Sequence, residues 1–272
     1  MSQTITDEQM SVYFKEGYVI LEDVVAPESL AEAKASYEQT IAEALLLRRA
    51  PRDESTGFLK GHRFQNPHHP ALAQRPLMEA LSTPDILDFA QRLSGDNFAM
   101  YGIAAFAMND DFDYKGAWHR DTYSAWGKDS PRELRVREIE RMHTTQILLA
   151  LHDDDCFWMV PRSHNRANTE EEETRFEDNR TGWEEMFSGA VQVKLRAGSA
   201  VPFDARCIHR GLKRPGKPRR SLFIVYGATD EACHSGITGW AKEPEYSEES
   251  YLDSLPIPLR NAIENTQSAL KT

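Results

Sequence analysis

Apolar residues recur at helical spacing in the first third of the chain. Residues 6–17 begin with Thr6, whose hydroxyl suits an N-cap, continue with acidic residues that favour a first helical turn, and end at Gly17. In residues 27–50, Pro27 suits the first helical turn, and the apolar positions that follow are three or four residues apart: Leu30, Ala33, Tyr37, Ile41 and Leu45. The pattern therefore predicts a helix over each of these two ranges.

The remaining pattern predicts one more helix and many strands. Residues 18–25 read as a short strand, and residues 76–95 as a helix with a break near Pro84. From about residue 98 the chain consists of short β-rich runs separated by charged or Gly/Pro-containing loops: FAMYGIAAFAM, TTQILLALH, FWMVP, VQVKLRAGSAVPF and SLFIVYGA. Helices followed by many short strands predict a mainly β protein, an antiparallel sandwich or barrel with flanking helices. The acidic run at 169–187 is predicted as a solvated helical excursion.

Length and composition narrow the class of protein. A chain of 272 residues is expected to form one domain, with a helical part over about 1–97, a β core over about 98–230 and a C-terminal segment over 231–272. The net charge of −11 argues against a nucleic-acid partner, and no apolar run approaches the roughly 18 residues that a membrane helix needs. Three scattered cysteines and the absence of a signal-peptide pattern at the start predict a cytoplasmic protein.

The stretch AWHRDTYSAWG at 117–127 contains two residues that can bind a metal. On an extended segment the side chains of His119 and Asp121 point to the same face, so both can contact one ion. His209 is the best-placed third ligand, because it lies at the end of a predicted strand. Two histidines and one carboxylate are typical of a non-haem iron site with open positions. Alone, the pair is more often a structural histidine hydrogen-bonded to an aspartate.

An arginine follows His209 after a basic loop. Arg220 lies at the start of the strand SLFIVYGA, where a guanidinium can hold a dicarboxylate through two charge-assisted hydrogen bonds. The alternative is a surface cation among the neighbouring basic residues.

In order along the chain, these elements resemble the phytanoyl-CoA dioxygenase family of Fe(II)/2-oxoglutarate-dependent oxygenases. The opening ITDEQMSVYFKEGYVILEDVVAPESL, the metal motif WHRD, the central TQILLALHDDDCFWMVPRSH, the distal AGSAVPFDARCIHRG and the final strand RRSLFIVYG carry the resemblance, which covers nearly the whole chain. The resemblance implies a double-stranded β-helix, a jelly roll of the cupin type. It also implies that His119, Asp121 and His209 bind Fe(II) and that Arg220 binds the distal carboxylate of 2-oxoglutarate.

The reaction that this resemblance implies consumes 2-oxoglutarate and O2 and releases succinate and CO2 while a small molecule is oxidised. Related halogenases replace the carboxylate ligand by a small residue, so the presence of Asp121 favours hydroxylation or another oxidation over halogenation. Two other functions stay open: a non-catalytic binding protein of the same fold, and a metallohydrolase that uses the same three ligands.

The sequence departs from the family pattern at two places. Arg162 occupies the glycine position of the usual Pro-Gly-Ser-His loop, where it either faces an anionic substrate or lies at the surface. Gly211 occupies a position where many relatives have a hydroxyl that helps to hold 2-oxoglutarate. Thr144 and Gln146, on one face of a predicted strand, are the candidates for a replacement donor, with an inward structural role as the alternative.

Further side chains are candidates for contacting a small-molecule substrate. An early loop at 57–70 carries His62, Arg63 and Gln65, and the segment after the metal motif carries Tyr123 and Trp126. Packing against the β core is an equally good explanation for the aromatic residues. Arg48, Arg49, Arg52 and Lys60 are expected to form a local basic rim.

Overall fold

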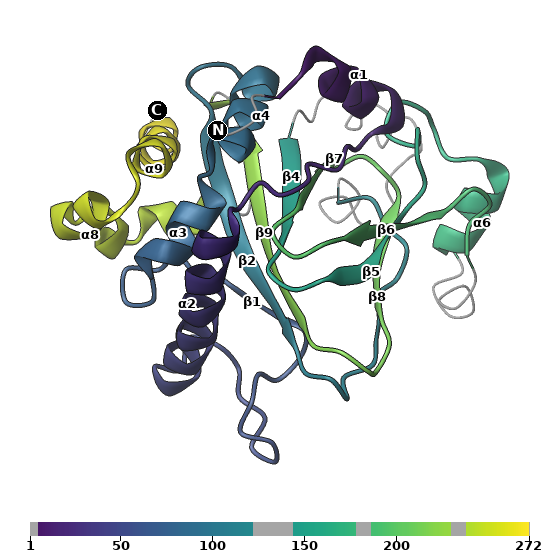
Figure 1. The fold of residues 1–272 in the computed structure, drawn as a ribbon. Coiled ribbons are helices and arrows are strands. Elements are labelled where there is room, and N and C mark those ends of the chain that lie inside the picture. The colour runs from purple at the N-terminus through teal and green to yellow at the C-terminus, as the bar shows by residue number, and fades with distance from the viewer. Residues whose placement is uncertain (1–4, 122–143, 178–185, 230–237, 272) are drawn as a thin grey trace.

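A computed structural model describes residues 5–121, 144–177, 186–229 and 238–271 of the chain. Its strands form two antiparallel sheets (Figure 1). The five-stranded sheet has the order β1-β2-β9-β4-β7 and the four-stranded sheet the order β3-β8-β5-β6. The strands are β1 (Arg63–Gln65), β2 (Ala99–Met108), β3 (Tyr114–Lys115), β4 (Thr144–Ala150), β5 (Asp154–Met159), β6 (Val191–Leu195), β7 (Ala200–Asp204), β8 (His209–Lys213) and β9 (Arg219–Gly227).

Helices cover the outer face of the five-stranded sheet (Figure 1). They are α1 (Asp7–Glu16), α2 (Pro27–Leu46), α3 (Arg75–Leu81), α4 (Pro84–Ser94) and α9 (Ile257–Ala269), with the 3-10 helices η2 (Thr238–Lys242) and η3 (Pro244–Ser247). Helix α8 (Glu249–Ser254) packs on η3 and α9, and α6 (Glu170–Glu177) lies beside the smaller sheet. Tyr37 of α2 ties the two layers together, because its hydroxyl donates a hydrogen bond to the carbonyl of Phe106 on β2 at 2.7 Å. The helices thereby fix the position of the sheet that carries part of the site.

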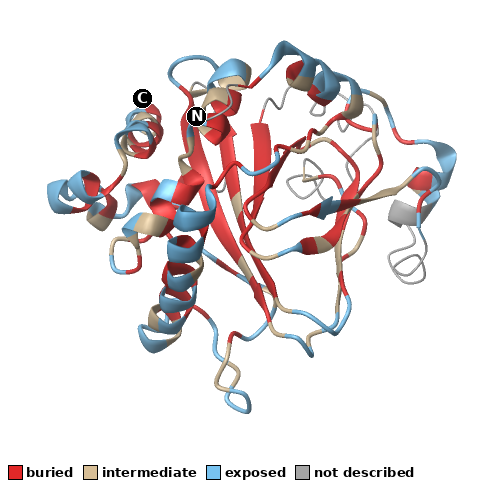
Figure 2. Cartoon of the chain, viewed as in Figure 1, coloured by how far each residue is buried: buried red, intermediate tan, exposed pale blue. Residues whose placement is uncertain are grey.

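Along the central strands β4 and β9, alternate side chains belong to two different hydrophobic cores. Almost every residue of these strands is buried (Figure 2). Leu222 and Ile224 of β9 pack into the large core under the helices. Their neighbour Phe223 points the other way, into the space between the sheets, where Phe203 of β7 and Phe157 of β5 belong to a second core. Two sheets that bury one set of side chains between them form the predicted jelly roll, so the fold-class prediction is confirmed.

The predicted helices form with small changes at their ends. Thr6 caps α1 in a capping box with Gln9, and Gly17 ends the helix in the left-handed conformation, at a φ of 85°. The helix predicted over 27–50 ends at Leu46, and the helix predicted over 76–95 divides into α3 and α4, with the break just before Pro84 as expected. The proline accounts for the break because it can begin a helix and cannot continue one.

The strand predicted over residues 18–25 is reduced to two isolated bridges with β7. Tyr18 pairs with Phe203 and Leu21 pairs with Ala200. Between these bridges the partner strand contains Pro202, which accepts a hydrogen bond from the backbone of Val19 and has no N–H to return. A continuous ladder therefore does not form. Among the described residues, no helix is long and apolar enough to cross a membrane.

Candidate metal centre

Three predicted ligands converge between the two sheets. The structure places His119, Asp121 and His209 so that one ligand atom of each lies within 4.8 Å of the other two. Nε2 of His119 lies 3.3 Å from Oδ1 of Asp121, and Nε2 of His209 lies 3.6 Å from Oδ2 of Asp121. Both imidazole rings therefore direct the same nitrogen at one carboxylate.

The backbone determines which nitrogen of each histidine is free. Nδ1 of His119 lies 2.9 Å from the carbonyl oxygen of Ala117, and Nδ1 of His209 lies 2.9 Å from the carbonyl oxygen of Cys207. A carbonyl oxygen only accepts, so in each ring Nδ1 carries the proton and donates it. Nε2 then keeps its lone pair, which is the form of histidine that binds a divalent metal. The residues present therefore fit an iron ion.

The electrostatics of the cluster favour a carboxylate at Asp121 beside a neutral His209. Burial lowers the pKa of His209 to about 4, and the charge of His119 acts in the same direction. Burial acts to raise the pKa of Asp121 and to lower that of His119, but the attraction between the carboxylate and the two imidazoles outweighs burial, so the pKa of Asp121 lies well below its usual range and that of His119 above it. At neutral pH the cluster therefore offers one anionic and one neutral ligand without first losing a proton.

Backbone pairing and a buried arginine hold the His119 segment in place. The backbones of His119 and His209 exchange two hydrogen bonds, of 3.0 and 2.9 Å. Between the two ligands, Arg120 points to the opposite side, is fully buried, and donates hydrogen bonds to Asn168 and to the carbonyl oxygens of Ser163 and Arg206. The sequence analysis did not single out Arg120, although the alternation that brings His119 and Asp121 together also places the residue between them on the other face.

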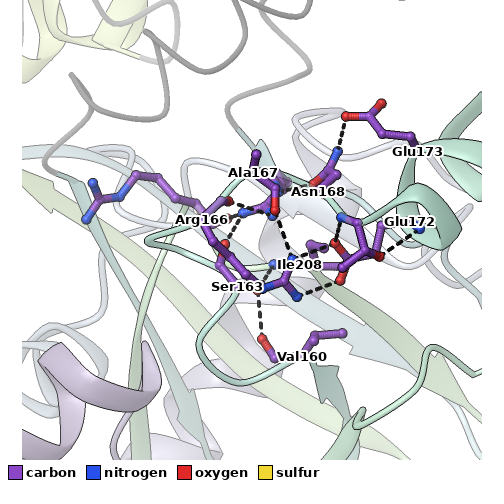
Figure 3. Close-up of polar contacts among 11 residues, drawn as sticks. Val160, Ser163, Arg166, Ala167, Asn168, Glu172, Glu173 and Ile208 are labelled. Carbon is purple, nitrogen blue, oxygen red and sulfur yellow. Dashed lines mark hydrogen bonds and ion pairs between the residues drawn. The ribbon is translucent and has the colours of Figure 1, made fainter.

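The loop after β5 is hydrogen-bonded to the backbone just before His209. Figure 3 shows Ser163 between Val160 and Ile208: its hydroxyl donates to the carbonyl of Val160 and accepts from the N–H of Ile208, the residue before His209. Farther along the loop, Arg166 makes two hydrogen bonds of 2.7 Å to Glu172 on α6 (Figure 3). This network anchors the loop on the helix predicted from the acidic run.

Gln146 approaches the metal centre from the five-stranded sheet. Its side-chain amide donates a hydrogen bond of 2.5 Å to Oδ2 of Asp121, and the side chain is buried. Thr144 lies two residues earlier on the same face of β4 and is also buried. Gln146 is therefore positioned to orient the carboxylate of Asp121.

The two arginines at the start of β9 lie on opposite faces. Arg220 lies on the helix-covered side, where all its nitrogens are engaged: Nε donates to Glu38 of α2 at 2.5 Å, Nη1 to the carbonyl of Met108 and Nη2 to Asn109. This placement does not fit the role predicted for Arg220, because its guanidinium lies on the helix-covered side and each of its three nitrogens already donates within the protein.

Arg219 is the arginine that faces the space between the sheets. Its Nε donates to Asp154 at 2.8 Å, and its guanidinium carbon lies 4.6 Å from the centre of the Phe106 ring. Within the described part of the chain, neither Nη group of Arg219 makes a hydrogen bond. Its Nη1 lies 3.7 Å from the point where a Cβ on Gly211 would lie, two residues along β8 from His209. Arg219 therefore presents a two-nitrogen fork on the face that also carries the metal ligands.

The residues predicted to contact the substrate divide into two groups. His62 stacks on Tyr114 with ring centres 4.2 Å apart, and Arg63 and Gln65 lie exposed on the edge strand β1. Arg162 lies at the surface, where it makes hydrogen bonds of 2.9 and 2.7 Å to Glu16. Tyr123 and Trp126, the other two predicted contacts, lie outside the described residues.

Arg162 also shows how this chain replaces the usual glycine of its loop. Its φ of 63° lies in the left-handed region, which costs a residue with a side chain roughly 1–2 kcal/mol. The backbone N–H donates to the carbonyl of Glu16 at 2.8 Å, and the side chain pairs with the carboxylate of the same residue. These contacts offset part of the strain, and they turn Arg162 away from the metal centre.

The metal ligands and the jelly roll define the class, a non-haem iron protein with two histidines and one carboxylate. Residues 13–221 match the model of the family described as phytanoyl-CoA dioxygenase (PhyH), and the chain belongs to that family. The family and the His119–Asp121–His209 set make the protein an Fe(II)/2-oxoglutarate-dependent oxygenase, which confirms the predicted function class.

Similar proteins agree with this class. An ectoine dioxygenase of Nocardia farcinica is 21% identical over 261 residues, which cover 89% of this chain and 84% of the relative. The structure of EctD from S. alaskensis with 2-oxoglutarate and 5-hydroxyectoine superposes with a TM-score of 0.64 at 18% identity, covering 84% of this chain and 78% of that one. HygX from Streptomyces hygroscopicus, with nickel and 2-oxoglutarate bound, gives a TM-score of 0.62 at 17% identity and covers 83% of this chain and 88% of that one.

Proposed function

We propose that this protein hydroxylates a small polar metabolite or natural-product intermediate in the cytoplasm, with Fe(II) held by His119, Asp121 and His209. The observation that carries the proposal is the arrangement of the two rings, each tied through Nδ1 to a backbone carbonyl and directing Nε2 at the same carboxylate. The aspartate ligand favours hydroxylation over halogenation. The scattered cysteines, of which Cys156 and Cys207 are buried and free, suit a reducing compartment.

When bound, iron and 2-oxoglutarate supply the oxidising chemistry, and O2 and 2-oxoglutarate are converted to succinate and CO2 as the substrate is oxidised. The protein itself holds the metal ligands in position. The backbone pairing of His119 with His209 fixes the angle between the two rings, and Gln146 fixes the carboxylate of Asp121 through its hydrogen bond. Three protein ligands leave positions of the metal open for the cosubstrate and O2.

For the distal carboxylate of 2-oxoglutarate we propose Arg219 in place of Arg220. The free Nη groups of Arg219 match the two oxygens of a carboxylate, and Asp154 holds the guanidinium from the Nε side. Ser221 donates a second hydrogen bond to the same oxygen of Asp154, so the aspartate is itself held in place.

For an anionic substrate we propose a basic cavity beside the edge strand β1. Arg63 and Gln65 line a cavity of about 640 Å³ together with Arg48 and Arg49, and Glu243 is the single acidic residue of its described lining. In a chain with a net charge of −11, this local excess of positive charge favours a substrate that carries a carboxylate or phosphate. A panel of acids and their neutral amides, assayed for succinate release, tests this part. Equal stimulation by the two halves of the panel would contradict it.

Anaerobic titration of the metal-free protein, first with Fe(II) and then with 2-oxoglutarate, tests the proposed function. We expect one Fe(II) per chain and a weak visible charge-transfer band on addition of 2-oxoglutarate. A folded protein that binds iron but gives no band, and shows no binding of 2-oxoglutarate by calorimetry, would contradict the proposed role and favour the hydrolase.

A further inference from the structure

One tyrosine, Tyr114, lies beside Gly211 and close to Arg219, the arginine of the proposed cosubstrate site. Tyr114 belongs to β3 and pairs with Lys213 of β8, four residues beyond the metal ligand His209. A Cβ placed on Gly211 would lie 2.9 Å from Cε1 of Tyr114, and a Cβ placed on Gly116 would lie 2.8 Å from its hydroxyl oxygen. The ring therefore extends from its own strand position, past Gly211, toward the segment that leads to His119.

The two glycines make room for this ring. Both hypothetical Cβ atoms would approach the tyrosine more closely than 3.0 Å, a distance that real Cβ atoms essentially never show. Any side chain at Gly211 or Gly116 would displace the tyrosine. Because neither glycine has a positive φ, close packing rather than backbone conformation makes glycine necessary here.

The other face of the ring is also held. His62 stacks on Tyr114 with an interplanar angle of 21°, and it also stacks against Phe106, the ring that lies under the guanidinium of Arg219. Burial, and then the charges of Arg63 and Arg219, lower the pKa of His62 to about 4, so this ring is neutral at pH 7. The ring of Tyr114 is therefore packed between Gly116 and Gly211 on one side and the neutral ring of His62 on the other.

Tyr114 and Arg219 both lie close to the side-chain face of Gly211. The position of a Cβ on Gly211 lies 2.9 Å from Cε1 of Tyr114 and 3.7 Å from Nη1 of Arg219. Within the described residues, the Tyr114 hydroxyl makes no hydrogen bond, and it is a donor attached to the ring carbon next to Cε1. A carboxylate has about four sites that accept hydrogen bonds, so the fork of one arginine leaves sites for a further donor.

We propose that Tyr114 donates a hydrogen bond from its hydroxyl to the carboxylate of 2-oxoglutarate that Arg219 holds, and that Gly211 and Gly116 are glycine to let it do so. This inference rests on the proposed function, because it assigns a second residue to the same cosubstrate site. It explains how a chain with no hydroxyl at position 211 retains a neutral donor beside the arginine.

The test is the affinity for 2-oxoglutarate, measured by anaerobic calorimetry on the Mn(II)-loaded protein. Tyr114→Phe keeps the ring and removes the donor, so the Kd is expected to rise about tenfold, which is typical for the loss of one hydrogen bond to a charged group. The thermal midpoint should stay unchanged. Tyr37→Phe, which removes a hydroxyl under the helices, is the matched control and should leave the Kd unchanged.

A double variant separates donation from packing. Tyr114→Ala alone is expected to weaken binding at least as much as Tyr114→Phe, and adding Gly211→Ser to it places a hydroxyl near Arg219 and should recover most of the affinity. Gly211→Ser with Tyr114 retained should weaken binding, because the added Cβ displaces the ring.

The failures of the two proposals are distinguishable. If the wild-type protein binds Mn(II) but no 2-oxoglutarate, the proposed function falls and this inference falls with it. If the wild-type protein binds 2-oxoglutarate and Tyr114→Phe binds it within about twofold of the same Kd, the cosubstrate site stands and the role of Tyr114 is overturned.

Discussion

Two neighbouring arginines on opposite faces of β9 differ in how many of their nitrogens are hydrogen-bonded within the protein. On the face covered by helices, Arg220 uses its guanidinium to join Glu38, Met108 and Asn109, and it thereby connects α2 with the end of β2. On the face between the sheets, Arg219 is held through Nε alone and keeps two nitrogens for another molecule. A charged residue on a buried strand is thus available to bind another molecule only where the fold leaves some of its donors unpaired.

The same contrast separates the hydroxyls of the two regions. Tyr37, under the helices, donates to a main-chain carbonyl, and burial raises its pKa far above the usual value for tyrosine. Tyr114, between the sheets, donates to no described residue and lies over glycine. The hydroxyl of Tyr37 is paired within the protein, whereas the hydroxyl of Tyr114 and the two Nη groups of Arg219 have no hydrogen-bond partner among the described residues.

Removing the carboxylate ligand should have the largest effect on the inner face. Asp121→Ala leaves two histidines without their anionic partner, so we expect loss of iron from the purified protein and no detectable succinate release. Circular dichroism should show an unchanged fold, because the side chain of Asp121 is 31% exposed and belongs to no hydrophobic core. Normal iron content and turnover in this variant would remove the metal assignment.

Exchange of the adjacent arginines tests the comparison directly. Arg219→Gln removes a charged fork, and the Kd for 2-oxoglutarate should rise roughly 100-fold, equivalent to about 3 kcal/mol. Arg220→Gln should leave that Kd within about twofold and instead lower the free energy of unfolding by about 1–2 kcal/mol, since it removes hydrogen bonds to Glu38 and Met108. Calorimetry and urea unfolding of both variants measure the two effects. The reverse pattern would return the cosubstrate to Arg220.

Gln146→Leu should weaken metal binding without removing it. The substitution keeps the volume of the side chain and deletes the hydrogen bond to Asp121, so the affinity for Fe(II) is expected to fall about tenfold, as for other residues that orient a ligand. Competition with a chelator gives the affinity. Unchanged Fe(II) affinity, together with weakened binding of 2-oxoglutarate, would instead support a direct contact with the cosubstrate.

The smallest effect is expected on the outer face. Tyr37→Phe deletes a hydrogen bond to the carbonyl of Phe106 and should lower the free energy of unfolding by about 1 kcal/mol. Binding of Fe(II) and of 2-oxoglutarate should be unchanged. A loss of cosubstrate affinity in this variant would show that the two faces are coupled through β2.

Some of these features could be predicted from residue pattern and others could not. The alternation of apolar residues predicted a β core with outer helices, and the pair His119 and Asp121 was recognisable because alternation alone places them on one face. Arg220 was chosen by its distance along the chain from His209. The loop between β8 and β9 decides which of two adjacent arginines faces the space between the sheets, and a shift of one residue reverses the face of every side chain.

Contacts between distant residues were beyond the reach of sequence reasoning. Arg162 was a candidate for the substrate site because of its place in a motif, yet Glu16, 146 positions earlier, draws it to the surface. The role of Tyr114 depends on Gly211, His62 and Arg219, which come from three other segments of the chain. No local spacing relates these residues.

By itself, the sequence determined the elements with a strong period, the residue types able to bind iron, and the family to which they belong. These are local properties, because a helical or extended segment fixes which of its own side chains share a face. The tertiary structure decided which side chains from different segments meet, and which donors remain free when they do. Strand register and loop length determine which side chains of different segments come into contact. Both depend on the packing of the whole chain rather than on any one segment.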